Sequence, residues 1–326
     1  MSPSLDATQD KAPEKPLPFF SQMSQAGFGD RVFQRLTQFF AFLILLLAFM
    51  TAFTLWMASR DCIHKMGWNF LTGSDWDPVN SIFGAVPYVY GTIVSSFLAL
   101  LIATPFGLGI SLFLTELAPQ KLREPVAFLV ETLAAIPSVV YGLWGIFLLA
   151  PFMRVYIDPF LSKYIGGPFF KEPSTGLSLF TAGVILSIMV LPTITAISRE
   201  VFESVPNSYR ESAKALGATN WETIRLAVMK PSKVGLLGAV MLALGRALGE
   251  TMAVTMVIGN KPEVSTNLLN ASHSMASVIA NEFSEAVGDT HISALAEIGL
   301  LLMVITLVLN IAAHLLVWFT TSKFQR

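Results

Sequence analysis

Arg246 and Glu250 are the residues best suited to chemistry, because they are opposite charges in the middle of a long apolar segment. Between Val234 and Ile258 no other residue is charged. In a continuous helix Arg246 would lie about 18 Å from either end, too deep for its side chain to reach the surface easily. The i,i+4 spacing would place Glu250 on the same helix face. A charge at that depth predicts a functional site, since placing it there costs about 2.5–3.5 kcal/mol.

Two interpretations of this pair stay open from the residues alone. The pair can neutralise itself within the helix or bridge to another subunit, which is a structural role. It can also line a polar path, or relay protons or ions, across the membrane. The chain contains no phosphate-cradling GxxxxGKS/T loop, no nucleophile elbow and no zinc motif. We therefore expect a protein that is not an enzyme, with no catalytic residue, no cofactor and no metal site.

The elements that must position this pair are membrane helices. The chain has 326 residues, of which 53% are hydrophobic and 13% charged, as in integral membrane proteins. A single cysteine, Cys62, excludes an internal disulfide. Six nearly uncharged stretches are long enough to cross a bilayer. They cover roughly residues 39–58, 88–115, 126–150, 177–197, 234–258 and 295–319.

The loops between these stretches predict the orientation. When the distant Lys11 and Lys15 are left out, one side of the membrane carries 12 basic residues and the other six. The excess places both termini in the cytoplasm. The polar, proline-rich start predicts a disordered cytoplasmic tail. The expected segments are this tail at 1–30, a first membrane helix and outer loop at 31–87, a transmembrane domain at 88–320 with a cytoplasmic loop at 198–233, and a second tail at 321–326.

The cytoplasmic loop has a helical pattern of its own. Apolar and charged residues alternate at helical spacing over 207–218, and Gly217 is expected to close that helix in the left-handed conformation. A second helix is expected over 220–229, with Asn220 as its N-cap and Lys230-Pro231 as its end. These helices can rest on the lipid surface, or they can dock into a groove on a cytoplasmic partner.

Part of this loop resembles a known signature. Glu211-Ser212-Ala213, followed by Leu216-Gly217-Ala218 and Pro231, is similar to the "EAA" loop of permease subunits in bacterial ABC importers. The chain departs from that pattern in having a serine in place of the second alanine and a lysine where leucine usually precedes the proline. In that family the loop is the coupling helix that docks on the ATPase. The resemblance assigns that docking to Tyr209, Arg210, Glu211, Ser212, Ala213, Leu216, Gly217 and Ala218.

Two further segments narrow the resemblance. LAAIPSVVYGLWG (133–145) and GRALGETMAVTMVIGN (245–260) resemble permeases of phosphate-specific importers of the Pst type, and the likeness extends over roughly 30–325. Met252-Ala253-Val254 and Gly259-Asn260 favour the PstC-type subunit over its PstA-type partner. The resemblance implies an all-α integral membrane protein with six transmembrane helices and the type I ABC-importer permease (MetI-like) architecture.

The resemblance also implies a multi-pass subunit of the bacterial inner membrane that moves inorganic phosphate into the cytoplasm by alternating access. Its partners would be a PstA-type permease, a PstB-type ATPase dimer that hydrolyses ATP, a periplasmic PstS-type binding protein and membrane lipid, without nucleic acid. Arg246 would face the path, and Glu250 would compete for it and keep binding weak enough for release. Thr251 and Thr255 would add hydroxyl groups.

Three alternatives remain beside phosphate import. A permease of the same architecture can carry another oxyanion such as sulfate or molybdate, because an arginine recognises charge more than element identity. An ion-coupled carrier or channel would use Arg246 and Glu250 as a relay and would leave the 198–233 loop without a role. A scaffold or sensory subunit is disfavoured, because no loop is large enough for a soluble domain.

Overall fold

A computed structural model describes residues 28–171 and 175–322 of the chain, which are mostly helical. Residues 1–27 and 323–326 lie outside this range, so most of both predicted tails falls there. In the described part, six helices are long and apolar enough to cross a membrane. They are Gly29–Ala58, Val86–Leu117, Ser138–Tyr164, Leu179–Glu203, Asn220–Gly249 and Asp289–Leu315. The predicted helical architecture with six spans is confirmed.

The chain divides into two units, and the first ends at Thr54. Its described part is most of helix α2 (Phe28–Ala58). This helix exposes large apolar side chains on all sides, including Phe33, Leu45 and Phe49. A helix that is apolar all round matches a lipid environment, so its composition accounts for the exposure.

The second unit begins with short elements that form one end of the helix bundle. They are α3 (Arg60–Met66), α4 (Trp68–Thr72) and an antiparallel hairpin of β1 (Trp76–Asp77) and β2 (Ile82–Phe83). The Trp76 indole donates a hydrogen bond of 2.9 Å to Glu282 of α15 (Met275–Glu282). His291 of α16 (Asp289–Ser322) lies 2.9 Å from the same carboxylate oxygen. One acidic side chain therefore holds the hairpin, α15 and α16 together.

The segment before α15 is fixed to α5 (Val86–Leu112) by close backbone contact. A Cβ at Gly91 would lie 2.0 Å from the His273 carbonyl oxygen, so this crossing requires glycine. The Met275 amide donates to the Thr92 hydroxyl at 2.9 Å. Burial lowers the pKa of His273 to about 4, so its ring is neutral near pH 7. The crossing is thus a rigid, uncharged joint.

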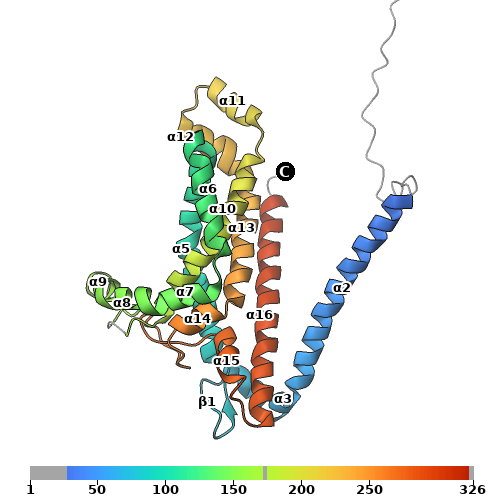
Figure 1. The fold of residues 1–326 in the computed structure, drawn as a ribbon, viewed down its shortest axis with the longest axis vertical. Coiled ribbons are helices and arrows are strands. Elements are labelled where there is room, and N and C mark those ends of the chain that lie inside the picture. Colours follow the sequence, from blue (N-terminus) through green and yellow to red (C-terminus); the bar gives the residue numbers. More distant parts are fainter. Residues whose placement is uncertain (1–27, 172–174, 323–326) are drawn as a thin grey trace, which may run out of the picture. The chain divides into compact units, whose positions relative to one another are not determined.

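Helices α5, α10 (Leu179–Glu203) and α13 (Lys230–Gly249) form the centre of the bundle and run lengthwise with α16 (Figure 1). Small residues let α5 and α10 approach closely. A Cβ at Gly183 would lie 2.8 Å from the Leu98 Cβ, and one at Gly107 would lie 2.8 Å from the Ile194 side chain. Such contacts are typical of membrane helices, whose association depends on packing rather than on exclusion of water.

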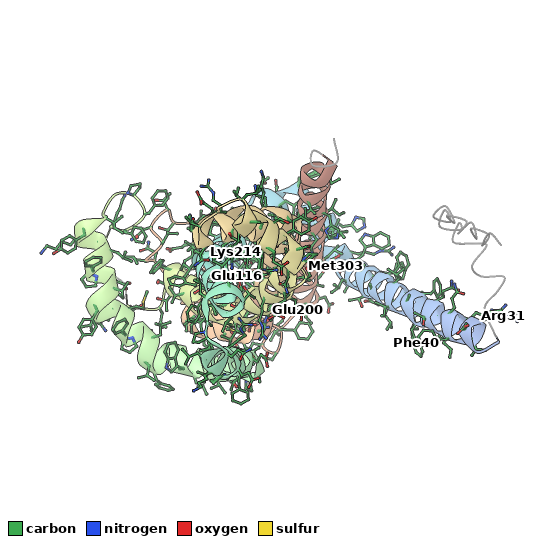
Figure 2. The ribbon with its side chains drawn as sticks, turned by 90° about the horizontal axis from the view of Figure 1, so that it is seen from above. Arg31, Phe40, Glu116, Glu200, Lys214 and Met303 are labelled. Carbon is green, nitrogen blue, oxygen red and sulfur yellow. The ribbon has the colours of Figure 1, made fainter. Side chains whose placement is uncertain are left out.

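The bounds predicted for the third span, 126–150, are wrong, because the helix breaks inside them and the apolar helix long enough to cross a membrane is Ser138–Tyr164. Helix α6 (Gln120–Ala135) ends at Ile136, and both Ile136 and Pro137 are extended. Proline disfavours the helical conformation in the residue before it, and α7 (Ser138–Trp144) then starts in a new direction. The chain continues through η2 (Gly145–Leu149), α8 (Ala150–Phe152), η3 (Met153–Ile157) and α9 (Asp158–Tyr164), which leave the bundle sideways (Figures 1 and 2).

The loop after α10 contains the two predicted helices with two corrections. Helix α11 (Asn207–Ala215) is followed by Gly217 at φ +86°, which confirms the left-handed closure. The N-cap of α12 (Asn220–Thr223) is Thr219, not Asn220, because its hydroxyl and the Glu222 carboxylate form a reciprocal capping box. Pro231 does not end the helix. The π-helical turn η4 (Ile224–Met229) precedes α13, and Pro231 lies in the first turn of α13, where proline is tolerated.

Candidate translocation site

The predicted fifth span at 234–258 is also interrupted, at the position where Arg246 and Glu250 were expected to pair. Helix α13 ends at Gly249, Glu250 is extended with ψ 128°, and α14 (Met252–Val257) starts anew. The two residues therefore do not share a helix face. No ion pair in the described part of the chain joins them. Glycines at 245 and 249 lower the cost of ending the helix here.

Glu250 instead lies at the start of α14. One of its carboxylate oxygens accepts a long hydrogen bond of 3.4 Å from the Ala253 amide. A carboxylate at this place satisfies a free amide and interacts favourably with the helix dipole. The predicted pairing of Glu250 with the Arg246 guanidinium is thus corrected, because α13 ends at Gly249 and the extended Glu250 lies beyond it.

Arg246 is in the last turn of α13, and its side chain is exposed on the surface of the single chain. Its Nη1 donates to the Thr193 hydroxyl of α10 at 3.2 Å. It also lies near enough to Tyr141 of α7 for an electrostatic interaction. Of the five N–H groups of a guanidinium, the described residues engage one. The remaining donors have no hydrogen-bond partner among the described residues.

The hydroxyl groups of Thr251 and Thr255 are used locally. Thr255 donates to the Thr251 carbonyl at 2.7 Å, and Thr251 donates to the Gly249 carbonyl at 3.3 Å. Both residues are half-buried. They contribute to the geometry of the break more directly than to an anion site, and their predicted role in the path stays a prediction.

Two glycines of the 133–145 segment allow α14 to pack against α7. A Cβ at Gly142 would lie 2.3 Å from the Met256 sulfur and 3.3 Å from the Ala253 Cα. A Cβ at Gly145 would lie 2.3 Å from Ile185 and 2.6 Å from Val257. The break after Arg246 is therefore supported from the α7 side, which makes the two sequence segments one structural unit.

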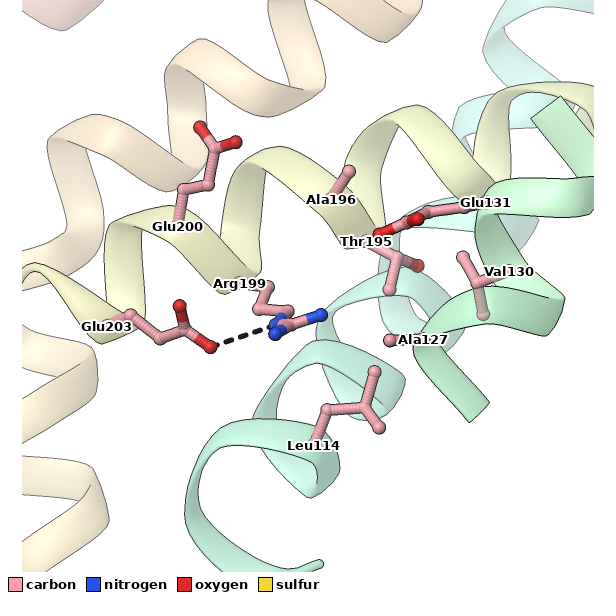
Figure 3. Close-up of a pocket in the computed structure, with 9 residues that line it drawn as sticks. All are labelled: Leu114, Ala127, Val130, Glu131, Thr195, Ala196, Arg199, Glu200 and Glu203. Carbon is pink, nitrogen blue, oxygen red and sulfur yellow. Dashed lines mark hydrogen bonds and ion pairs between the residues drawn. The ribbon is translucent and has the colours of Figure 1, made fainter. Parts of the chain in front are cut away.

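A polar cavity lies farther along α10, toward the α11 end, and α5–η1 (η1 is Phe113–Leu117) and α6 form its other walls (Figure 3). Arg199 and Glu203 form an ion pair of 2.8 Å inside it, and Glu200 of α10 lines it as well. Glu131 of α6 lies beside Thr195. Three carboxylates and one guanidinium thus line the cavity, two of the carboxylates on α10 beyond Thr193 and one on α6. The cavity is lined by Leu114, Ala127, Val130, Glu131, Thr195, Ala196, Arg199, Glu200 and Glu203.

Most of the residues assigned to the coupling helix lie on the surface of α11 and its exit turn. Tyr209 is 56% exposed and Leu216 is 89% exposed, although both are large and apolar. Glu211, Ser212 and Gly217 are exposed as well, whereas Ala213 and Ala218 are half-buried. An exposed apolar pair on a short protruding helix is typical of a docking surface.

Arg210 differs from its neighbours, because its side chain turns inward. It forms an ion pair of 2.7 Å with Glu116 of η1, and both side chains are largely buried. It also donates to the carbonyl groups of Val205 at 2.6 Å and Phe202 at 3.0 Å. Arg210 therefore fastens α11 to the end of α10 and to the extension of α5.

Three residues of this arrangement, Thr193, Glu116 and Arg199, were not predicted from the sequence. The i,i+4 spacing of Arg199 and Glu203 was a usable signal, since it predicts an ion pair on one helix. Thr193 and Glu116 had no such signal, because each meets its partner across a large sequence separation. No group of three potential metal ligands occurs among the described side chains.

The crossing helices, the exposed guanidinium between them and the protruding α11 define a membrane permease subunit. A family model for the "Binding-protein-dependent transport system inner membrane component" matches residues 103–318. The chain belongs to this family. It is a multi-pass protein of the inner membrane and a transport component rather than a catalytic one.

Full-length relatives carry one common name. The "Phosphate transport system permease protein PstC" of Mesorhizobium japonicum is 46% identical over 293 residues, which cover 88% of this chain and 90% of that protein. The protein of the same name from Pasteurella multocida is 45% identical over 302 residues, with 91% and 94% covered.

Solved structures show the same fold at low sequence identity. A bacterial ABC transporter for import of the acidic polysaccharide alginate has a chain with a TM-score of 0.55 and 18% identity, covering 88% of this chain and 98% of its own. The inward-facing MetNI methionine ABC transporter gives a TM-score of 0.52 and 18% identity, covering 71% and 94%. These likenesses confirm the MetI-like permease architecture.

Proposed function

We propose that this chain is the PstC-type permease subunit of an ATP-driven importer and that it moves inorganic phosphate across the inner membrane. The names of the relatives, at 46% and 45% identity over most of the chain, support the substrate. The family supports a requirement for a separate binding protein. The remaining partners would be a PstA-type permease and a PstB-type ATPase dimer.

The observation that carries the path assignment is the exposed Arg246 guanidinium between apolar helices, with no carboxylate paired to it in the described chain. An unpaired guanidinium would be costly against lipid, so a polar lumen between this chain and a second permease is the better environment. Its planar donors fit phosphate oxygens. Thr193 holds the side chain in place from α10.

The cavity beyond Thr193 offers a means of release. An anion that leaves Arg246 along α10 meets Glu131, Glu200 and Glu203 with Arg199 as their counter-charge. The surplus of carboxylates makes anion binding weaker there than at Arg246. Transport requires both binding and release of the anion. The weaker anion binding in this cavity would favour release.

The excess of basic residues on the α11 side supports a cytoplasmic position for that end. Closing of the ATPases would then move α11 and switch the permease between outward-open and inward-open states. An ion-coupled carrier that works alone is disfavoured, since it gives the exposed Tyr209 and Leu216 no partner. Transport of sulfate or molybdate remains the second candidate, and competition for phosphate uptake distinguishes these anions.

The test is ATP-dependent phosphate uptake into vesicles that contain the full assembly. Arg246→Gln is expected to lower the maximal uptake rate about tenfold or more, because a charge-assisted hydrogen bond is worth about 1.5–3 kcal/mol. Arg246→Lys keeps the charge without the planar fork and is expected to lie between Gln and the wild type. Arg154→Gln, which alters another exposed arginine, is the control and should leave uptake unchanged. Wild-type uptake by assembled Gln and Lys variants would refute the path role.

A further inference from the structure

A groove of about 510 Å³ runs along α12, η4 and the start of α13, and the site described above does not use it. Its lining combines apolar and cationic side chains. The apolar members are Trp221, Leu226 and Met229; the charged ones are Glu222, Arg225, Lys230 and Lys233. Trp221 is 60% exposed and Leu226 is 55% exposed.

The groove follows one face of a continuous helical segment. Residues 221, 225, 229 and 233 recur every fourth position, whereas Ile224, Val228 and Ser232 on the other face are buried in the bundle. The outward face therefore differs both from a purely apolar surface that faces lipid and from a purely polar surface that faces water. It places aromatic and aliphatic groups beside cations at the end of a membrane span.

Two cations of this groove, Arg225 and Lys230, are not balanced by a carboxylate of the described residues. The Glu222 carboxylate accepts hydrogen bonds from the Thr219 amide and hydroxyl, both at 2.8 Å, so it is committed to the helix cap. Arg225 and Lys230 form no ion pair with any described residue. By contrast, Arg199 and Arg210 each have a carboxylate partner. The groove therefore presents positive charge to an outside anion.

The groove does not face the proposed substrate path. At about 100° per residue along α13, Lys233 lies about 140° and Lys230 about 160° around the helix from Arg246. The groove thus opens on the side opposite the proposed lumen, where lipid is the expected neighbour. This step rests on the proposed function, whereas the composition and charge of the groove do not.

We propose that this groove binds the headgroup of an anionic phospholipid. The phosphate would meet Arg225, Lys230 and Lys233, and the glycerol region would lie against Trp221 and Leu226. A strongly hydrated free anion gains nothing from an apolar floor, whereas an amphipathic one does. Basic side chains next to a span attract anionic lipid, and tryptophan prefers the same interfacial depth.

The site would stabilise the joint between α11 and α13. Thr219 and Glu222 form the capping box of α12 directly after the exit turn of α11, so a lipid held by the next helical turns would steady the segment that follows the docking helix. We therefore expect anionic lipid to affect ATP-driven uptake as well as to bind.

Binding is tested on the complete assembly reconstituted in phosphatidylcholine with or without spin-labelled phosphatidylglycerol. Because one basic residue contributes about fivefold to such binding, Arg225→Gln should weaken it about fivefold and Arg225→Gln/Lys230→Gln/Lys233→Gln about a hundredfold. Lys121→Gln, which removes an exposed lysine on α6, should leave binding unchanged. If the triple variant fails to fold, the single variant and its control decide the matter.

Two results would overturn the proposal. One is wild-type lipid binding by the folded triple variant or by Arg225→Gln. The other is unchanged lipid binding combined with loss of the ATPase subunits from the triple variant, which would make the groove a protein-docking surface. Lipid binding is measured without phosphate, so its outcome is independent of whether Arg246 lines the path.

Discussion

Arg246 shows how a membrane protein keeps a charge available. Its guanidinium has one hydrogen-bond partner in the described chain, the Thr193 hydroxyl, which orients it without neutralising it. A carboxylate in that position would compete with the substrate for every donor. The break after Gly249 removes Glu250 from that position, so the local backbone decides the charge of the site.

Glu250→Gln separates the charge of this residue from its structural role. Glutamine keeps an oxygen that can accept from the Ala253 amide, so α14 should remain capped. Loss of the negative charge should strengthen phosphate binding at Arg246 and slow its release. We expect a lower maximal uptake rate with an unchanged or lower apparent KM, measured in vesicles that contain the full assembly.

Glu250→Ala is the comparison, because it removes both the charge and the cap. If Glu250→Gln keeps the wild-type maximal rate while Glu250→Ala loses it, the residue acts on structure alone. That pattern would contradict any electrostatic effect of Glu250 on the path.

Part of the candidate site could be predicted from the sequence, residue by residue. A lone Arg and Glu in an apolar run were sufficient to single out a candidate site, because charge at membrane depth is expensive. Their expected pairing was wrong, because it assumed a continuous helix. Thr193 could not be predicted for another reason. It is 53 residues from Arg246 in the sequence, and no periodic pattern connects residues so far apart.

At the scale of elements, α11 is both a surface and a joint. Its exposed side chains Tyr209 and Leu216 face outward, while Arg210 reaches back to Glu116 and to the last carbonyl groups of α10. Movement of α11 therefore has a direct connection to α5 and α10, the two helices at the centre of the bundle. In the proposed importer, docking on the ATPase and transmission of its movement would therefore fall to different residues of one helix.

Arg210→Gln should uncouple ATP hydrolysis from uptake. Breaking a largely buried ion pair costs several kcal/mol, since it leaves Glu116 uncompensated, and α11 loses its anchor. We expect the ATPase subunits to remain bound, ATP hydrolysis to continue, and phosphate moved per ATP to fall at least about threefold, because α11 would no longer be fixed to α5 and α10. The measurement is uptake and hydrolysis in the same vesicles.

The control for this experiment is Leu216→Asp, which alters the exposed surface and leaves the ion pair intact. It should release the ATPase subunits, as seen by co-purification. Arg210→Gln/Glu116→Gln removes both charges and should recover part of the coupling. Equal loss of the ATPase from Arg210→Gln and Leu216→Asp would place Arg210 on the docking surface instead.

Helix boundaries were predicted well where the periodicity of apolar residues sets them. They were predicted poorly where a proline is involved. The two helices of the 198–233 loop, α11 and α12–η4, were predicted from alternating apolar and charged residues. Pro137 ended a helix, whereas Pro231 did not, although both were visible in the sequence. The difference is position, since Pro231 lies in a first turn, and sequence alone did not show where that turn begins.

At the scale of the molecule, the second unit presents two contrasting membrane-level faces. Helix α16 exposes Val304, Leu307, Val308 and Ile311, an apolar stripe at helical spacing that fits lipid. Helix α10 instead exposes Ala196 and Glu200 along the cavity that follows Thr193. In the proposed importer, this polar face would form half of a lumen, and a second permease would supply the other half.

These faces predict opposite reactivity for introduced cysteines. The native chain has one cysteine, and Cys62 is fully buried, so it should contribute little background. Ala196→Cys should react rapidly with a membrane-impermeant, charged methanethiosulfonate in the assembled importer, because water fills the lumen. Leu307→Cys should react slowly, because a thiol in the hydrocarbon core stays protonated and a charged reagent does not enter the core. We expect the Ala196→Cys rate to change with ATP, since alternating access opens and closes this cavity. Equal rates at the two positions would mean that the α10 face is sealed by protein or lipid, and the path would then have to run elsewhere than past Arg246.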